Sequence, residues 1–267
     1  MKSLKTQRGF TLVELLISVT IGLLVTSATI FIYISVAESS TITLKASKLN
    51  QELAAVLTVM TNDIRRAGYS NAALANLNAP QNNIFSAIDN TALEVIDNMT
   101  DNNQVAANSA AGGECIVYAY DFNDNGNLDD ADIGGFRLNN GVVQMRQQGD
   151  IISNVNDHDN CNDADDTWLN MTDGSLITVS ALNFSLDSSE CLNASEPNGL
   201  DDDGDGDIDN AEEIDCYTQV PANGSGDVTV ETRGVTISVT GSLINDPTVT
   251  LTLNEDIRVR NDLIRVR

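Results

Sequence analysis

The chain has 267 residues, 42% of them hydrophobic, so it can bury a core in one large domain or two small ones. Asp and Glu number 39 against 14 Lys and Arg, which gives a formal net charge of -25 at pH 7. No basic surface could offset phosphate repulsion across such a body, so we expect no nucleic acid to bind directly.

The first predicted element is an apolar helix. Residues 10–37 contain one charged residue, Glu14, and no proline. About 20 helical residues cross the hydrocarbon core of a bilayer, so this segment is long enough to span it. The basic residues before it, Lys2, Lys5 and Arg8, should stay on the cytoplasmic side. We therefore expect a membrane anchor that places the rest of the chain outside the cytoplasm.

The helix should continue beyond the apolar segment in an amphipathic form. Apolar residues recur there at three- to five-residue steps among charged ones: Leu44, Leu49, Leu53, Val56, Leu57, Met60 and Ile64. This spacing predicts a helix with one apolar face over residues 38–67. Gly68 is the first good stop signal, so we predict one helix from Phe10 to Ala67, whose outer half must pack on other elements.

The remaining residues, 68–267, are predicted to form a β-rich head. Short period-two runs indicate strands near Cys115–Tyr120, Gly135–Leu138, Val142–Arg146, Leu176–Leu186, Val228–Val239 and Thr248–Val259. Asn139-Asn140-Gly141 predicts a hairpin turn, and residues 71–113 predict a long connection with a little helix. The expected fold is α+β, an antiparallel sheet covered by the amphipathic half of the helix.

The four cysteines all follow the apolar segment. None has C-x-x-C spacing, and the chain has a single histidine, His158, so a zinc site is poorly supported. An even number of cysteines outside the cytoplasm favours two disulfides, although four cysteines allow three pairings and buried thiols are the alternative. Of these pairings we favour the sequential one, Cys115 with Cys161 and Cys191 with Cys216.

Two acidic segments fit the twelve-residue calcium loop D-x-D-x-D-G-x-I-x-x-x-E. In residues 201–212 the candidate ligands are Asp201, Asp203, Asp205, Asp207 through its carbonyl, and Glu212. In residues 121–132 they are Asp121, Asn123, Asn125, Asn127 and Asp132. The first set predicts tighter calcium binding, because the second has neutral amides and a shorter last ligand. The alternative is that both segments are solvated turns.

The N-terminus carries a recognisable motif. Residues 1–18 resemble the class III signal of type IV prepilins and type II secretion pseudopilins, with a short basic leader, Gly9, and then Phe10-Thr11-Leu12-Val13-Glu14. The resemblance implies that a prepilin peptidase in the inner membrane removes residues 1–9 and methylates the amine of Phe10. It also implies that Glu14 meets the N-terminus of a neighbouring filament subunit. In the alternative, a simple anchor, Glu14 snorkels to the interface or pairs with its own Phe10 amine.

Further segments resemble PilW-like minor pilins and the related J-type pseudopilins. They are MTNDIRRAGYSN (residues 60–71), CIVYAYD (115–121), GGFRLNNGVVQMR (134–146) and, near the C-terminus, VRND (259–262). The resemblance implies a minor pilin that initiates, primes or caps type IV pilus assembly with other minor and major pilins. Such a protein moves from the inner membrane to the cell-surface pilus. The alternatives are a J-type pseudopilin of type II secretion and a membrane-anchored calcium-binding adhesin.

We expect no enzymatic activity. His158 lies in an acidic segment, residues 156–166, that predicts a solvated loop with no nucleophile pattern. No Gly-rich phosphate loop, H-E-x-x-H or G-x-S-x-G motif is present. The single tryptophan, Trp168, is expected in the core or at its rim rather than in a sugar or partner site.

Overall fold

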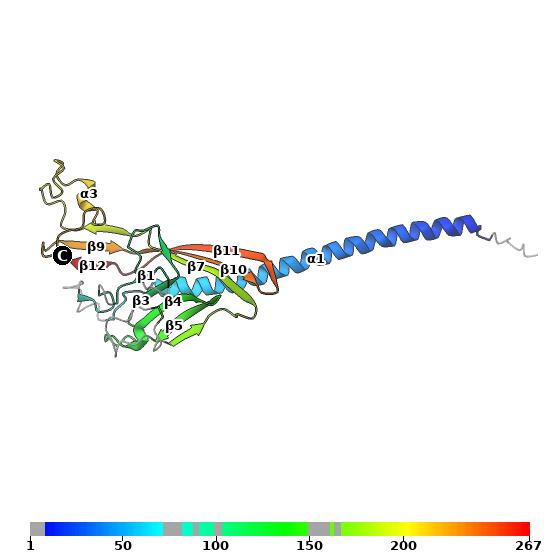
Figure 1. Ribbon diagram of the computed structural model, residues 1–267, viewed down its shortest axis with the longest axis horizontal. Helices are drawn as coiled ribbons and strands as arrows, with labels where there is room; N and C mark the ends of the chain where they lie inside the picture. Colours follow the sequence, from blue (N-terminus) through cyan, green and yellow to red (C-terminus); the bar gives the residue numbers. More distant parts are fainter. Residues whose placement is uncertain (1–8, 72–81, 88–90, 99–102, 149–160, 163–166) are drawn as a thin grey trace, which may run out of the picture. The chain divides into compact units, whose positions relative to one another are not determined.

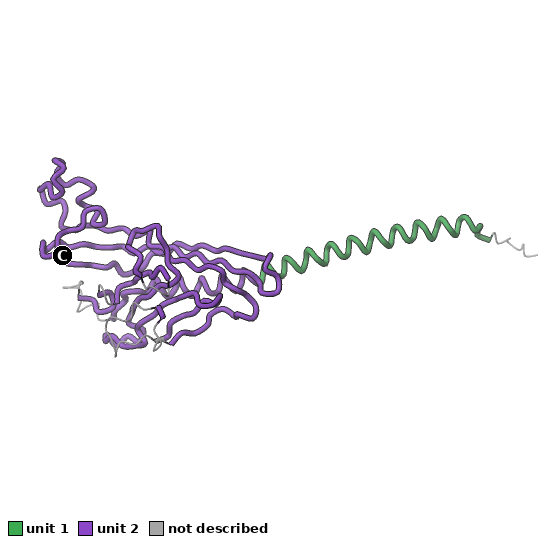
Figure 2. Tube along the Cα trace, in the orientation of Figure 1, with its two compact units in different colours: residues 1–48 green, residues 49–267 purple. Residues whose placement is uncertain are grey.

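The computed structural model describes residues 9–71, 82–87, 91–98, 103–148, 161–162 and 167–267 (Figure 1). It divides the chain into two compact units, residues 1–48 and 49–267 (Figure 2). The division falls within one helix, α1 (Leu12–Ile64), so each part of that helix is described with its own unit. The predicted helix from Phe10 to Ala67 is confirmed, with residues 65–68 forming turns instead of its last turn.

In the first unit, α1 is apolar on every side as far as Ala37. Its large hydrophobic side chains are exposed, and a stretch of the helix is long and apolar enough to cross a membrane by length and composition. Hydroxyl groups within this stretch donate to carbonyls one turn back, as Ser18 does to Glu14 O (2.7 Å) and Ser27 to Leu23 O (2.7 Å). Such bonds hide polar groups, so the segment suits a hydrocarbon environment.

In the second unit, the rest of α1 is amphipathic and buried on one face. Leu49, Leu53, Met60 and Ile64 are completely buried within the main hydrophobic core. They are separated by four, seven and four residues, which places them on one side of a helix. The expectation that this half of the helix covers a β-structure is confirmed.

The strands form three antiparallel sheets. Five strands make the first, in the order β1 (Glu94–Ile96), β3 (Cys115–Ala119), β4 (Ile133–Asn139), β5 (Val142–Gln148) and β6 (Thr167–Asn170). Four make the second, in the order β11 (Asp246–Arg258), β10 (Gly234–Leu243), β7 (Ile177–Ser185) and β2 (Gly112–Gly113). Three make the last, in the order β12 (Leu263–Val266), β9 (Val228–Thr232) and β8 (Glu190–Asn193). Two short helices, η2 (Asp130–Asp132) and α3 (Ala211–Ile214), lie in the acidic loops.

The four-stranded sheet supplies much of the surface on which α1 packs. Alternate residues of β10 are buried, as period-two patterning requires, and they include Val235, Ile237 and Val239. At Gly241 an added Cβ would lie 3.2 Å from a methyl of Leu53, so the helix approaches this strand closely. A larger residue there would push the helix and the strand apart.

Most strand predictions are confirmed, and one is wrong. Asn140 and Gly141 have positive φ (49° and 79°) between β4 and β5, as a two-residue hairpin turn requires. The single strand predicted over Val228–Val239 is in fact two strands, β9 and β10, which belong to different sheets. The break falls at Arg233, whose side chain is buried and lies 3.0 Å from the Glu231 carboxylate.

The connection predicted over residues 71–113 contains β1 and β2, and its described residues form no α-helix. The solvated loop predicted at 156–166, His158 included, lies outside the described residues except for Cys161 and Asn162.

Both predicted disulfides are confirmed. Cys115 pairs with Cys161 and Cys191 with Cys216, with Cα atoms 6.4 and 5.2 Å apart. Each bridge encloses one of the acidic loops, so it limits the freedom of that loop in the unfolded chain.

The helix stripe gives a first prediction. We expect Leu53→Ala to lower the free energy of unfolding of the second unit by about 2–5 kcal/mol, because Leu53 is completely buried and its loss leaves a cavity. Urea unfolding of the full chain in detergent, followed by circular dichroism, measures the change. Val59→Ala, on the exposed side of the same helix, is the control. Equal effects of the two changes would contradict the packing described here.

Candidate functional site

The residues of the N-terminal motif lie at the start of α1. Thr11 and Glu14 form a reciprocal cap: Glu14 Oε2 accepts from Thr11 N (3.0 Å) and Oγ1 (2.9 Å), and Glu14 N donates to Thr11 Oγ1 (3.3 Å). This T-x-x-E arrangement is a capping box, which satisfies backbone donors that a helix leaves unpaired at its start. This role of Glu14 was not predicted from the sequence. Gly9 and Phe10 precede the helix without regular secondary structure, and both are exposed.

The other end of α1 is fixed to the five-stranded sheet through Asp63. The hydroxyls of Tyr118 and Tyr120 donate to its two carboxylate oxygens at 2.7 and 2.8 Å. The guanidinium of Arg66 lies 4.2 Å from the ring centroid of Tyr120 and 4.0 Å from an Asp63 oxygen. Burial, followed by the Asp63 charge, raises the pKa of both tyrosines, so their hydroxyls remain protonated donors.

The last carbonyls of the helix region are satisfied by residues distant in sequence. Arg260 N donates to Arg65 O (3.1 Å), and Asn261 Nδ2 donates to Ala67 O (2.9 Å). Gly68 follows with φ of 73°, and its N donates to Ala119 O (2.8 Å). A glycine in the left-handed conformation commonly ends a helix, because other residues are strained there.

These contacts bring three of the distinctive sequence segments together. Residues 60–71, 115–121 and 259–262 all meet at the end of α1, which we call the helix-end junction. Three of the four segments that carry the resemblance therefore belong to one structural feature, the attachment of the helix to the strands.

The acidic loop at 121–132 leads from β3 towards β4. Asp121 Oδ2 accepts from Gly126 N (3.0 Å), Asn123 Oδ1 from Asn125 N (3.1 Å), and Asn125 Oδ1 from Asn127 N (2.6 Å). Positive φ values at Asp124 (59°) and Gly126 (72°) turn the chain sharply. The side chains of the first, third and fifth loop positions are therefore held by backbone amides.

The loop at 201–212 has the same framework at the same spacing. Asp201 Oδ2 accepts from Gly206 N (2.9 Å), Asp203 Oδ1 from Asp205 N (3.0 Å), and Asp205 Oδ1 from Asp207 N (2.7 Å). Oxygens of Asp201, Asp203 and Asp205 lie within 4.8 Å of one another. Carboxylates this close repel, and a divalent cation with oxygen ligands would relieve the repulsion.

The acid that closes each loop differs in position. In the first loop the predicted residue, Asp132, is buried and accepts from Phe122 N and Asp129 N, both at 2.8 Å. In the second loop the equivalent bonds belong to Glu213, which accepts from Asp202 N (2.6 Å) and Asn210 N (2.9 Å). Glu213 is buried, whereas the predicted Glu212 is exposed.

The second loop thus has one more residue than the first before the acid that makes these bonds. The spacing of the motif therefore predicted Glu212, whereas Glu213 is the residue that corresponds to Asp132.

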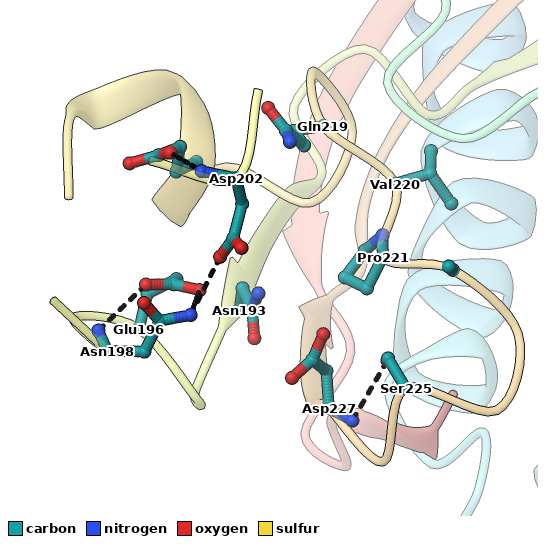
Figure 3. Close-up of a pocket in the computed structure, with 11 residues that line it drawn as sticks. Asn193, Glu196, Asn198, Asp202, Gln219, Val220, Pro221, Ser225 and Asp227 are labelled. Atoms are coloured by element: carbon teal, nitrogen blue, oxygen red, sulfur yellow. Dashed lines mark hydrogen bonds between the residues drawn. The ribbon is translucent and has the colours of Figure 1, made fainter. Parts of the chain in front are cut away.

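A cavity of about 460 Å³ beside this loop is lined by further acids, including Glu196, Asp202 and Asp227 (Figure 3). Asn198 Nδ2 donates to Glu196 Oε1 (2.8 Å) and Asp202 Oδ2 (2.7 Å), which draws the two carboxylates together. Desolvation is the largest cause that raises the pKa of Glu196, and the Asp202 carboxylate adds to it. The surroundings of the loop therefore favour cations.

The first loop is also bonded to the helix-end junction. Asn71 N donates to Asp121 Oδ2 (3.0 Å), Asp121 N to Tyr69 O (2.9 Å), and the Tyr69 hydroxyl to Asp124 Oδ1 (3.1 Å). Any ligand that orders this loop would consequently also stabilise the end of α1.

Trp168 lies at the rim of a small core cluster with Ile96, Val117 and the Cys115–Cys161 bridge. Arg137 stacks on its ring at 4.1 Å from the centroid. The expectation of a core or rim position is confirmed.

Two family models match the chain. The model described as prepilin peptidase-dependent protein B matches residues 42–259, well over half of the chain, and the prokaryotic N-terminal methylation motif matches residues 4–30. No curated protein and no solved structure gave a significant match.

The helix-end junction gives a second prediction. We expect Asn261→Ala to lower the free energy of unfolding by about 1–3 kcal/mol, because the Ala67 carbonyl loses its donor within a partly buried region. The same urea titration measures the effect. The control is Asn254→Ala, which changes an exposed asparagine on the edge strand β11. An Asn261→Ala variant as stable as Asn254→Ala would show that the junction does not hold the helix end.

Proposed function

Because the chain belongs to the family of prepilin peptidase-dependent protein B, we propose that it is a minor pilin that initiates, primes or caps type IV pilus assembly. Prepilin peptidase is its processing partner, and its N-terminal helix suits membrane anchoring. Other minor and major pilins are its proposed assembly partners. The observation that carries the proposal is one continuous helix that is apolar all round at its start and amphipathic where the head packs on it.

Glu14 has a specific place in this proposal. A charged side chain in hydrocarbon is costly, by about 3 kcal/mol at the helix centre on insertion scales and less near an end, so it needs a partner. Cleavage after Gly9 would create one, the amine of Phe10. In the uncleaved chain the Glu14 carboxylate accepts hydrogen bonds from Thr11. These bonds cap the start of the helix before cleavage creates the Phe10 amine.

The membrane-inserted precursor would place its head outside the cytoplasm, and the assembled form would lie in the pilus. A J-type pseudopilin of type II secretion remains the nearest alternative, since it shares the processing motif and the long helix. An adhesin that never polymerises would not need cleavage at Gly9, so processing separates it from both.

We further propose that the loops at 201–213 and 121–132 bind calcium. The gathered carboxylates of Asp201, Asp203 and Asp205 support the stronger site, and Glu213 rather than Glu212 has the position of the closing ligand. A carboxylate that accepts backbone N–H groups still has lone pairs for a cation. The first loop offers two amides, and Asn123 and Asn125 donate to Asp129 at 3.0 and 3.2 Å, so its affinity should be lower.

Processing gives the third prediction. Mass spectrometry of the mature protein should find N-methylated Phe10 as its first residue, because the motif places the cleavage after Gly9. An intact Met1 in cells that contain the peptidase, or a cut near Ala37, would contradict the pilin proposal. Gly9→Leu should leave the precursor uncut and serves as the matched control.

Calcium gives the fourth prediction. Calorimetric titration of the full chain in detergent should show calcium uptake, and Asp201→Ala combined with Asp205→Ala should abolish the tighter site. Glu213→Gln should weaken this site by about tenfold or more, whereas Glu212→Gln should change it little. No uptake by the parent chain would refute the calcium proposal, and a larger effect of Glu212→Gln would restore the spacing-based assignment.

A further inference from the structure

A second cavity of the head gathers positive charge in a strongly acidic chain. It measures about 480 Å³ and lies beside the three-stranded sheet. Three arginines line it, Arg233 after β9, Arg265 in β12 and Arg267 after β12. We call it the arginine cavity. The chain has a net charge of -25, so three arginines in one cavity require an explanation.

The buried carboxylate of Glu231 forms ion pairs with two of these arginines, Arg233 and Arg265. Glu231 is 2% exposed, and its oxygens lie 2.8 Å from Arg265 Nη2 and 3.0 Å from Arg233 Nε. The Tyr217 hydroxyl donates to the same carboxylate at 3.2 Å. Arg233 also donates to Leu93 O (2.9 Å). These bonds fix the two guanidinium groups, and removing one partner would leave a buried charge unpaired.

Arg267 is not part of this arrangement. Among the residues that the structure describes, its guanidinium makes no hydrogen bond or ion pair, and its Nε is buried without an acceptor. Arg265 Nε likewise has no acceptor there. Desolvation, opposed by Glu231 and reinforced by Arg233 and Arg267, lowers the pKa of Arg265. The cavity therefore holds donors and positive charge that the described chain does not use.

The acids that line the cavity do not balance the arginines. They are Glu231 and Glu94, two carboxylates against three guanidinium groups. Glu94 in addition accepts from Gln104 Nε2 at 2.7 Å. The side chains of the lining thus carry a formal charge of +1, and the guanidinium of Arg267, unpaired within the described chain, is the group that an anion inside the cavity would contact.

The other residues of the lining indicate which kind of ligand would carry the anionic group. Ala92, Val105 and Val220 give the cavity apolar walls, and its volume lies within the range of about 300–1,000 Å³ found for ligand sites. A carboxylate matches the planar guanidinium fork, and the methylene groups of a glutamate would cover apolar surface. We propose that the arginine cavity binds an acidic side chain presented by a peptide segment of a partner protein, with Arg267 as its main contact.

The proposal depends neither on calcium nor on filament assembly, and a binding experiment tests it. The full processed chain in detergent is titrated into fluorescein-labelled hexaglutamate at low salt, and fluorescence anisotropy is measured. Arg267→Gln should weaken binding by about tenfold. Arg260→Gln removes the same charge from an exposed position outside the cavity and should leave binding within about twofold. Labelled hexaglutamine should not bind.

Several outcomes would overturn the proposal. No binding of hexaglutamate, or an equal loss in Arg267→Gln and Arg260→Gln, would reduce the effect to diffuse attraction. Competition by inorganic phosphate as strong as that of unlabelled hexaglutamate would make the ligand a small oxyanion rather than a peptide. An Arg267→Gln chain that fails to fold would show that this guanidinium is structural. Arg267→Lys, which keeps the charge without the fork, should bind with intermediate affinity.

Discussion

The head depends on the burial of one apolar stripe of α1, Leu49 to Ile64, against the strands. Neither side is stable alone, because a single amphipathic helix and a sheet with one apolar face each expose surface that only the other covers. Each fully buried side chain of this kind contributes roughly 1.5–3 kcal/mol, and the stripe contains several. The polar contacts at the helix-end junction then determine where the helix stops. Asp63 and Asn261 contribute less free energy than the stripe, but they fix the position of the helix end on the strands.

One helix thus serves two surroundings. Its first part carries apolar residues on all sides and suits a bilayer, while its last part is polar except where the head packs. The cost of a carboxylate near the start of the apolar part is limited by the capping box with Thr11. In the proposed mature protein the amine of Phe10 would become a further partner of Glu14. The acidic loop at 121–132 shares hydrogen bonds with the helix end, so cation binding and attachment of the head would be linked.

The features predicted from sequence are those that local patterns determine. Helical periodicity predicted α1, alternation and the Asn140-Gly141 turn predicted the hairpin, and the calcium-loop pattern placed a glycine at the sharp turn of Gly206. The missed features depend on contacts between distant residues. The division of the segment Val228–Val239 into β9 and β10 was missed, because the strands that pair with each of them lie elsewhere in the sequence. The burial of Glu213 and its bonds to the backbone of Asp202 and Asn210 were missed, although the N-cap at Asn210 was a usable signal.

The central claim, that the last turns of α1 and the strands form one cooperative unit, is tested most directly by native-state hydrogen exchange. Mass spectrometry of the processed chain in detergent would compare amides of Leu53–Met60 with those of β10. The account predicts that both sets exchange through the same global unfolding, with equal free energies and equal dependence on denaturant. Exchange of the helix amides at much lower free energy than β10 would show that the helix is only loosely attached, and would contradict the account.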